Sequence, residues 1–131
     1  MASIFSRIIQ GEIPAYKIAE DDNYFAFLDV FPLSDGHTLV IPKQEVDNIF
    51  DLSPDNYSGL FLFSQKIGIA LKKAIPCNKV GISVVGLEVP HAHIHLIPIN
   101  QVSDMNFSKE KKKATDEQLK SVQTKILSFL Q

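Results

Sequence analysis

Short stretches of the chain alternate between apolar and polar residues, or stay apolar, between clusters of turn-forming residues. Such stretches are typical of β-strands. The run Asp21-Asp22-Asn23 indicates a hairpin turn, and Pro42 ends a further strand. The expected strands cover residues 15–20, 24–29, 37–41, 80–85 and 91–97. Because strands that follow one another in the chain usually pair, we predict an antiparallel meander sheet.

Elsewhere apolar residues recur at helical spacing, and capping residues mark where those helices begin. Ser3 can cap a short N-terminal helix. Ser53 caps a long central helix, which Pro76 must end. Thr115-x-x-Gln118 is a capping box for a C-terminal helix, and a short helical stretch is expected over residues 45–50. Helices gathered on an antiparallel sheet give the α+β fold class.

The long helix is apolar around more of its circumference than one sheet face can cover. Leu62, Phe63, Ile69 and Ala70 widen its main apolar stripe. Two arrangements would account for this width, namely deep burial within one chain or contact with a second subunit. In a domain this small, the width favours a partner subunit.

The composition indicates one folded domain, residues 1–131, because 45% of the residues are hydrophobic and 21% are charged. A net charge of −2 provides no basic field for nucleic acid. No apolar run reaches the ~18 residues of a membrane-spanning helix, and residues 1–7 lack the layout of a secretory signal. A single cysteine, Cys77, fits a reducing compartment. We therefore expect a cytoplasmic protein that binds neither nucleic acid nor membrane.

His91, His93 and His95 are spaced by two in the expected strand 91–97. The period of a strand puts all three side chains on one face. A lone strand histidine is ordinarily a hydrogen-bonded core residue, whereas three on one face indicate a site. Neighbouring pairs lie ~7 Å apart at Cα and the outer pair ~13 Å, which would strain a shared metal ion. A row of imidazoles suits an anion better, so phosphate chemistry is the first hypothesis and metal binding the second.

The form His-x-His-x-His-x-x with apolar x, at residues 91–97, resembles the signature of the histidine triad (HIT) nucleotide hydrolases and transferases. Other landmarks of that family follow in the same order within residues 3–98. They are Ile4-Phe5 through Ile8-Ile9, Gly11-Glu12-Ile13-Pro14, Phe27-Leu28-Asp29-Val30 and residues 36–43. The resemblance implies a HIT-like fold, a homodimer that uses the long helix, and chemistry at a nucleotide phosphate without a cofactor.

The resemblance also implies roles for the histidines. His93 matches the nucleophile that attacks the α-phosphorus of a nucleotide, and a neutral imidazole is nucleophilic near neutral pH. Its other ring nitrogen must then be held by an acceptor such as a main-chain carbonyl. His91 and His95 would hold phosphoryl oxygens and shuttle protons, and His37 matches a fourth, supporting histidine.

The resemblance places the nucleotide along further positions. Asp29 matches a residue that accepts hydrogen bonds from the ribose hydroxyls, although a carboxylate there could also cap the next turn. Glu88 and Val89 precede the first histidine, beside the expected phosphate. The positions that match the base-binding residues are Ile4, Phe5, Ile8, Ile13, Phe27, Val30 and Leu39.

The chain departs from the family pattern in two places. Some relatives hold a structural zinc with two cysteines and a histidine. The matching positions here are Ser3, Ser6 and Glu45, so we expect no metal. The segment before His91 is also shorter than in many nucleoside phosphoramidases, and Leu87 stands where an amide would orient the phosphate.

Together these features predict a purine-nucleotide hydrolase or transferase of the nucleoside phosphoramidase type, working through a nucleotidyl-His93 intermediate. A hydrolase of dinucleoside polyphosphates is one alternative. A nucleotide-binding regulatory module with vestigial hydrolysis is another, which the short loop and Leu87 would suit. The carboxylate of Glu88 favours amine over anionic leaving groups. A metal-binding strand is the remaining alternative, and metal analysis of the protein tests it.

Overall fold

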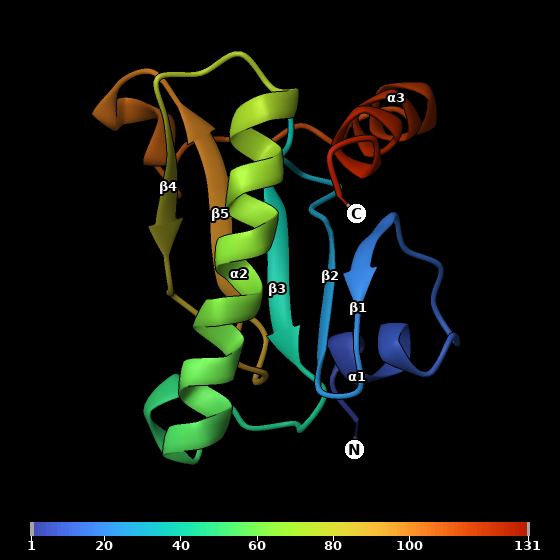
Figure 1. Ribbon diagram of the computed structural model, residues 1–131, viewed down its shortest axis with the longest axis vertical. Helices are drawn as coiled ribbons and strands as arrows, with labels where there is room; N and C mark the ends of the chain where they lie inside the picture. The colour runs from blue at the N-terminus through green and yellow to red at the C-terminus, as the bar shows by residue number, and fades with distance from the viewer. Residues whose placement is uncertain (1, 131) are drawn as a thin grey trace.

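The computed structural model describes residues 2–130, and within them the strands form a five-stranded antiparallel sheet (Figure 1). The strands are β1 (Lys17–Glu20), β2 (Tyr24–Leu28), β3 (Thr38–Pro42), β4 (Lys79–Ser83) and β5 (Ile94–Ile99). Their order is β1-β2-β3-β5-β4. The first three strands form the expected meander. The last two depart from it, because β5 lies between β3 and β4 and leaves β4 at the edge.

Three α-helices and two short 3-10 helices accompany the sheet in the part of the chain that the structure describes. They are α1 (Ile4–Ile9), α2 (Pro54–Ala74), α3 (Asp116–Leu127), η1 (Ile49–Asp51) and η2 (Val102–Met105). The predicted caps are present, because the side chains of Ser3, Ser53 and Thr115 accept hydrogen bonds from the backbone of the first turns. These local signals place all three α-helices correctly, and the α+β fold class is confirmed.

Two local predictions are wrong. The stretch 45–50 is not a helix, since only residues 49–51 form one 3-10 turn, which the Asn48 side chain caps by accepting from the Phe50 N–H. The histidine strand begins at Ile94 rather than at residue 91. Ahead of Ile94, the Ala92 N–H donates to the carbonyl of Val46 at 2.7 Å, and this bond holds the segment outside the sheet ladder.

The sheet separates two apolar cores. Figure 1 shows α2 lying across one face and α1 on the other side. The larger core lies under α2 and α3 and includes Ala26, Val40, Ile94 and Leu96. The smaller core lies against α1 and contains Phe5, Phe25, Phe27, Leu39 and Ile41. Because side chains alternate along a strand, the residues between those of the large core face α1, and His95 is one of them.

Two large apolar side chains on the outward side of α2 remain exposed in the single chain. Leu62 and Ile69, seven positions apart on one helix face, are 61% and 54% exposed, whereas Phe63 and Ala70 are buried in the larger core. Nowhere in residues 2–130 is a helix both long and apolar enough to cross a bilayer.

Candidate active site

The ladder of the sheet places His95 on the side of α1. Phe27 pairs with Leu39, and Leu39 pairs with His95, so these three side chains point the same way. His93 lies one residue before β5, with its ring centroid 4.9 Å from that of His95. The ring of Phe5 from α1 packs edge-on against His93 at 4.9 Å and against His91 at 5.8 Å. The rings of His93 and His95 therefore lie side by side at the N-terminal end of β5, and the Phe5 ring contacts both His91 and His93.

One ring nitrogen of His93 forms a hydrogen bond within the protein, and the other has no partner among the described residues. Its Nδ1 lies 2.8 Å from the carbonyl oxygen of His91, and because a carbonyl can only accept, Nδ1 carries the proton. Nε2 then holds a lone pair. Among the described residues Nε2 has no hydrogen-bond partner, and no buried nitrogen there is left without one, so Nε2 reaches the molecular surface. Burial lowers the pKa of His93, so the ring is neutral near neutral pH.

His37 and His95 are joined in a chain of hydrogen bonds that fixes the tautomer of each ring. The Leu33 N–H donates to Nδ1 of His37 at 3.0 Å, so the proton of His37 is on Nε2. That Nε2 lies 2.9 Å from Nδ1 of His95 and donates to it, which leaves the proton of His95 on its own Nε2. Burial, the largest cause, lowers the pKa of each ring to about 3. His95 therefore presents an N–H beside the lone pair of His93.

Asp29 begins the turn after β2 and also lies close to this chain of hydrogen bonds. Its Oδ1 accepts from the Phe31 N–H at 2.8 Å, so the capping alternative is realised, and its Oδ2 lies 3.6 Å from Nε2 of His37. Burial raises the pKa of this carboxyl. Atoms of Asp29, His37 and His95 lie within 4.8 Å of one another and could converge on a metal ion. The hydrogen bond between the two histidines, however, already uses both facing nitrogens.

His91 occupies a different position from the one the sequence suggested. Its Nε2 donates to the carbonyl of Pro42 at 2.8 Å, and its Nδ1 lies 2.8 Å from the hydroxyl of Ser3. The side chain is fully buried, and burial lowers its pKa. Both ring nitrogens of His91 thus already have partners within the protein, and its contact with a phosphoryl oxygen stays a prediction.

Most of the predicted base-binding and flanking positions gather in one place. They form or border the smaller core beside His93: Phe5, Ile8, Phe27, Leu39 and Val89. Three positions lie elsewhere. Ile4 is 48% exposed on the outer side of α1, and Ile13 is half-buried outside this core. Val30 packs on the larger core instead, across the sheet from the histidines.

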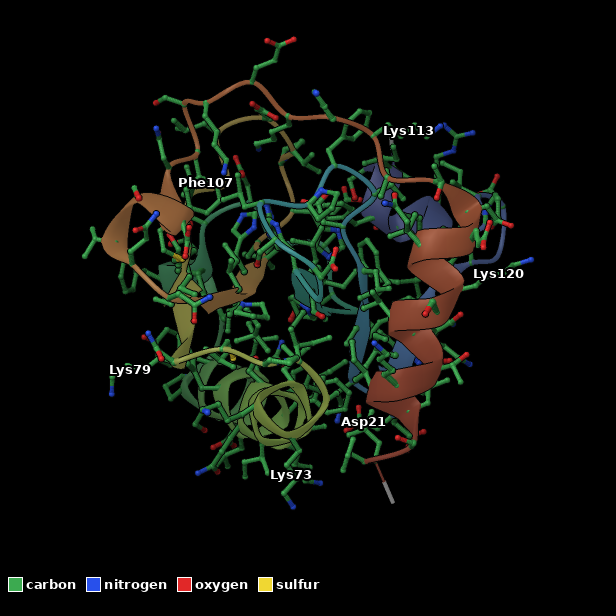
Figure 2. All side chains as sticks on the ribbon, turned by 90° about the horizontal axis from the view of Figure 1, so that it is seen from above. Asp21, Lys73, Lys79, Phe107, Lys113 and Lys120 are labelled. Carbon is green, nitrogen blue, oxygen red and sulfur yellow. The ribbon has the colours of Figure 1, made fainter. Side chains whose placement is uncertain are left out.

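A segment between β5 and α3, to which the sequence pattern assigns no role, crosses the site. It spans residues 100–114, and its Phe107 packs edge-on against His95 at 4.8 Å. Lys111 is half-buried, with Nζ 5.5 Å from the Phe107 ring centroid. Figure 2 shows the segment between the labelled Phe107 and Lys113 running along the molecule toward α3. An aromatic residue within a lysine-rich run was the available signal. The sequence pattern likewise gave no sign that Ser83 of β4 pairs with His95 of β5.

Comparisons with known proteins identify the family of the chain. A family model described as the HIT domain matches residues 10–102. An uncharacterized HIT-like protein of Borreliella burgdorferi is 39% identical over 102 residues, which cover 72% of this chain and 73% of that protein.

Solved structures are similar over almost the whole chain. A Hit-like protein of Bartonella henselae, described as involved in cell-cycle regulation, superposes with a TM-score of 0.86 at 31% identity, covering 98% of this chain and 96% of that one. A zinc-bound histidine triad protein of Mycobacterium smegmatis gives a TM-score of 0.80 at 26% identity, with 98% and 95% covered. The motif, the fold and these similarities together show that the chain belongs to the histidine triad family.

Proposed function

We propose that this protein hydrolyses or transfers purine nucleotides at the α-phosphorus, in the manner of a nucleoside phosphoramidase, through a nucleotidyl-His93 intermediate. One observation carries the proposal. The 2.8 Å hydrogen bond from Nδ1 of His93 to the His91 carbonyl assigns the lone pair to Nε2, the nitrogen that reaches the surface. An imidazole held in this tautomer, with a lowered pKa, is ready to attack without first losing a proton.

The reaction then takes two displacements at phosphorus. In the first, Nε2 of His93 bonds to the α-phosphorus while the bond from phosphorus to the leaving group breaks. The leaving group takes a proton from Nε2 of His95, which regains a proton from the attacking water or acceptor in the second displacement. In the second, water or another acceptor attacks the phosphorus, the phosphorus–nitrogen bond breaks, and the nucleoside monophosphate is released. The neutral His93 is regenerated with its proton still on Nδ1.

His95 is placed to serve both steps. Its Nε2–H adjoins the nucleophile and can donate to a phosphoryl oxygen or to the departing atom. A bound phosphate would raise the pKa of His95 from its low value, because negative charge stabilises the imidazolium. His37 holds the ring of His95 through the 2.9 Å hydrogen bond. Asp29, with Oδ2 not used by the turn, is the candidate for the ribose hydroxyls.

Two charges near the site act on the choice of leaving group in opposite directions. Glu88 is exposed and acts electrostatically on Asp29 and His93, which disfavours an anionic leaving group. Lys111 acts on Asp29, His37 and His95 from the other segment. Lys111 is the specific observation that favours the second candidate function, the hydrolysis of dinucleoside polyphosphates. We place the amine leaving group first, because Glu88 acts on the nucleophile itself.

The proposal includes a cytoplasmic homodimer. The exposed Leu62 and Ile69 on α2 and the unpaired edge of β4 lie on neighbouring elements, and together they offer an apolar surface for a second copy. Light scattering at micromolar concentration should give twice the chain mass, and Leu62→Asp should give the single mass. A wild-type monomer would contradict this assignment. The single cysteine, Cys77, supports a reducing compartment.

A covalent trapping experiment tests the proposed function. After rapid quenching with an adenosine phosphoramidate, peptide mass analysis should find one nucleoside monophosphate on the peptide that contains His93. His93→Ala should abolish the adduct and nearly all turnover while AMP still binds. His95→Ala should lose on the order of 10²–10⁴-fold, as a positioned acid or base does. An adduct on another residue, or substantial turnover by His93→Ala, would refute the mechanism.

A further inference from the structure

A polar network joins the N-terminal helix to the histidine segment. Glu45 follows β3, and its Oε1 accepts from the Ser3 N–H and from the Ser6 hydroxyl, each at 2.6 Å. The Ser6 N–H donates to the Ser3 hydroxyl oxygen at 3.0 Å, and that hydroxyl lies 2.8 Å from Nδ1 of His91. The network thus connects segments that are 42 and 88 residues apart in the chain.

The donors and acceptors of this network have one consistent assignment. His91 must donate from Nε2, because its partner there is the Pro42 carbonyl. Nδ1 of the neutral ring is therefore an acceptor, and the Ser3 hydroxyl donates to it. The hydroxyl oxygen of Ser3 can still accept from the Ser6 N–H. The Ser3 N–H and the Ser6 hydroxyl both donate to the Glu45 carboxylate, which can only accept. No donor faces another donor.

The network ends on the backbone that holds the nucleophile. The carbonyl oxygen of His91 accepts the Nδ1 proton of His93 at 2.8 Å, so the position of residue 91 decides how firmly that proton is held. Hydrogen bonds hold residue 91 at its ring and at the following peptide. The ring bonds to the Pro42 carbonyl and the Ser3 hydroxyl, and the N–H of Ala92 donates to the Val46 carbonyl. A shift of the His91 carbonyl would free Nδ1 of His93 and let the ring populate the other tautomer.

We propose that Ser3, Ser6 and Glu45 are positioning residues, which act through His91 to hold His93 in the tautomer that attacks phosphorus. This inference rests on the proposed function. Glu45 provides the fixed end of the network, since its carboxylate is ionised over the working pH range. The hydrogen bonds from Ser6 and Ser3 lower the pKa of that carboxyl to about 2. None of the three side chains contacts the reacting atoms.

The first test removes the Glu45 carboxylate and measures AMP binding alongside the rate. In Glu45→Ala, the rate of His93 nucleotidylation should fall roughly tenfold to a hundredfold, with KM and AMP affinity within about threefold, because a misplaced nucleophile loses rate rather than binding. Glu45→Gln retains an acceptor oxygen and should recover most of the rate. Asp47→Ala, which removes an exposed carboxylate from the same segment, is the matched control and should behave as wild type.

A second measurement reads the tautomer directly. The ring ¹⁵N chemical shifts of His93 should report one tautomer, protonated at Nδ1, in the wild type and in Asp47→Ala, and a mixture in Glu45→Ala. Ser3→Ala, which removes only the connecting hydroxyl, should give the same mixture and decides the question if Glu45→Ala does not fold. The Ser3→Ala, Glu45→Ala double variant should lose no more rate than the more impaired of the two single variants, because the residues act in series.

The ring ¹⁵N spectra separate failure of this inference from failure of the proposed function, since they need no turnover. Wild-type rate and an unchanged His93 tautomer in both Ser3→Ala and Glu45→Ala would overturn the positioning role. A wild-type protein that forms no nucleotidyl-histidine, yet changes tautomer in these variants, would overturn the proposed function and leave the positioning role standing.

Discussion

Acidification from about pH 7 to about pH 5 should lower the free energy of unfolding by about 4 kcal/mol, through His37 and His95. Both rings are buried and neutral, and burial lowers each pKa from 6.5 to about 3. Between those values the unfolded chain binds a proton at each histidine and the native protein does not. Stability therefore rises with pH in this window, and it is lost as the pH falls below 6.5.

The magnitude follows from integrating that difference in bound protons. Over the interval from about pH 7 to about pH 5, each histidine contributes about 2 kcal/mol, since one pKa unit corresponds to about 1.4 kcal/mol. Burial also lowers the pKa of His91 and His93, which adds to the loss. Burial raises the pKa of Asp29, which acts in the opposite direction. The expected change is a large part of the roughly 5–15 kcal/mol that stabilises a typical domain.

Urea unfolding at a series of pH values measures this change, and far-UV circular dichroism is the suitable probe because the chain has no tryptophan. The midpoint should fall by about 2 M urea over the interval. His37→Asn, which keeps an acceptor for the Leu33 N–H, should be less stable near neutral pH but should lose about 2 kcal/mol less on acidification. A wild-type midpoint that does not move, or an equally steep dependence in His37→Asn, would refute the reasoning.

Three further predictions follow from other parts of the molecule. Gly36→Ala should lower the free energy of unfolding in urea by about 1–3 kcal/mol, because Gly36 has φ +91° and a Cβ there would lie 3.0 Å from a side-chain carbon of Ile75. Gly68→Ala, where a Cβ would meet no atom within 4 Å beyond its chain neighbours and its own helix backbone, should be neutral or stabilising, and equal effects at the two sites would contradict the argument. Amine-leaving substrates should be cleaved faster than dinucleoside polyphosphates, with Glu88→Gln narrowing the ratio of kcat/KM values, and faster cleavage of polyphosphates by the wild type would exclude this role for Glu88. Turnover should survive treatment with a metal chelator, and metal analysis of the purified protein should find no stoichiometric zinc. Loss of bound zinc together with activity on chelation would contradict the expectation that no metal is needed.

The sequence by itself determined the features that depend on near neighbours in the chain. Helix starts at Ser53 and Thr115 and the stop at Pro76 were predictable, because a cap or a missing N–H acts within one helical turn. The spacing of the histidines likewise predicted that the rings of His93 and His95 lie side by side. The same reasoning failed at residues 45–50 and 91–93, where the local pattern competes with hydrogen bonds to distant segments.

Only the tertiary structure decided what each histidine can do. The proton of His91 is placed by a carbonyl 49 residues away and a hydroxyl 88 residues away, and the proton of His95 by a ring 58 residues away. It also decided that Phe107 covers His95 and that Val30 lies across the sheet from the site. An imidazole has the same two nitrogens in any sequence. Which of them carries the proton depends on the donors and acceptors that folding brings within about 3 Å, and these bonds do not exist until the chain is folded.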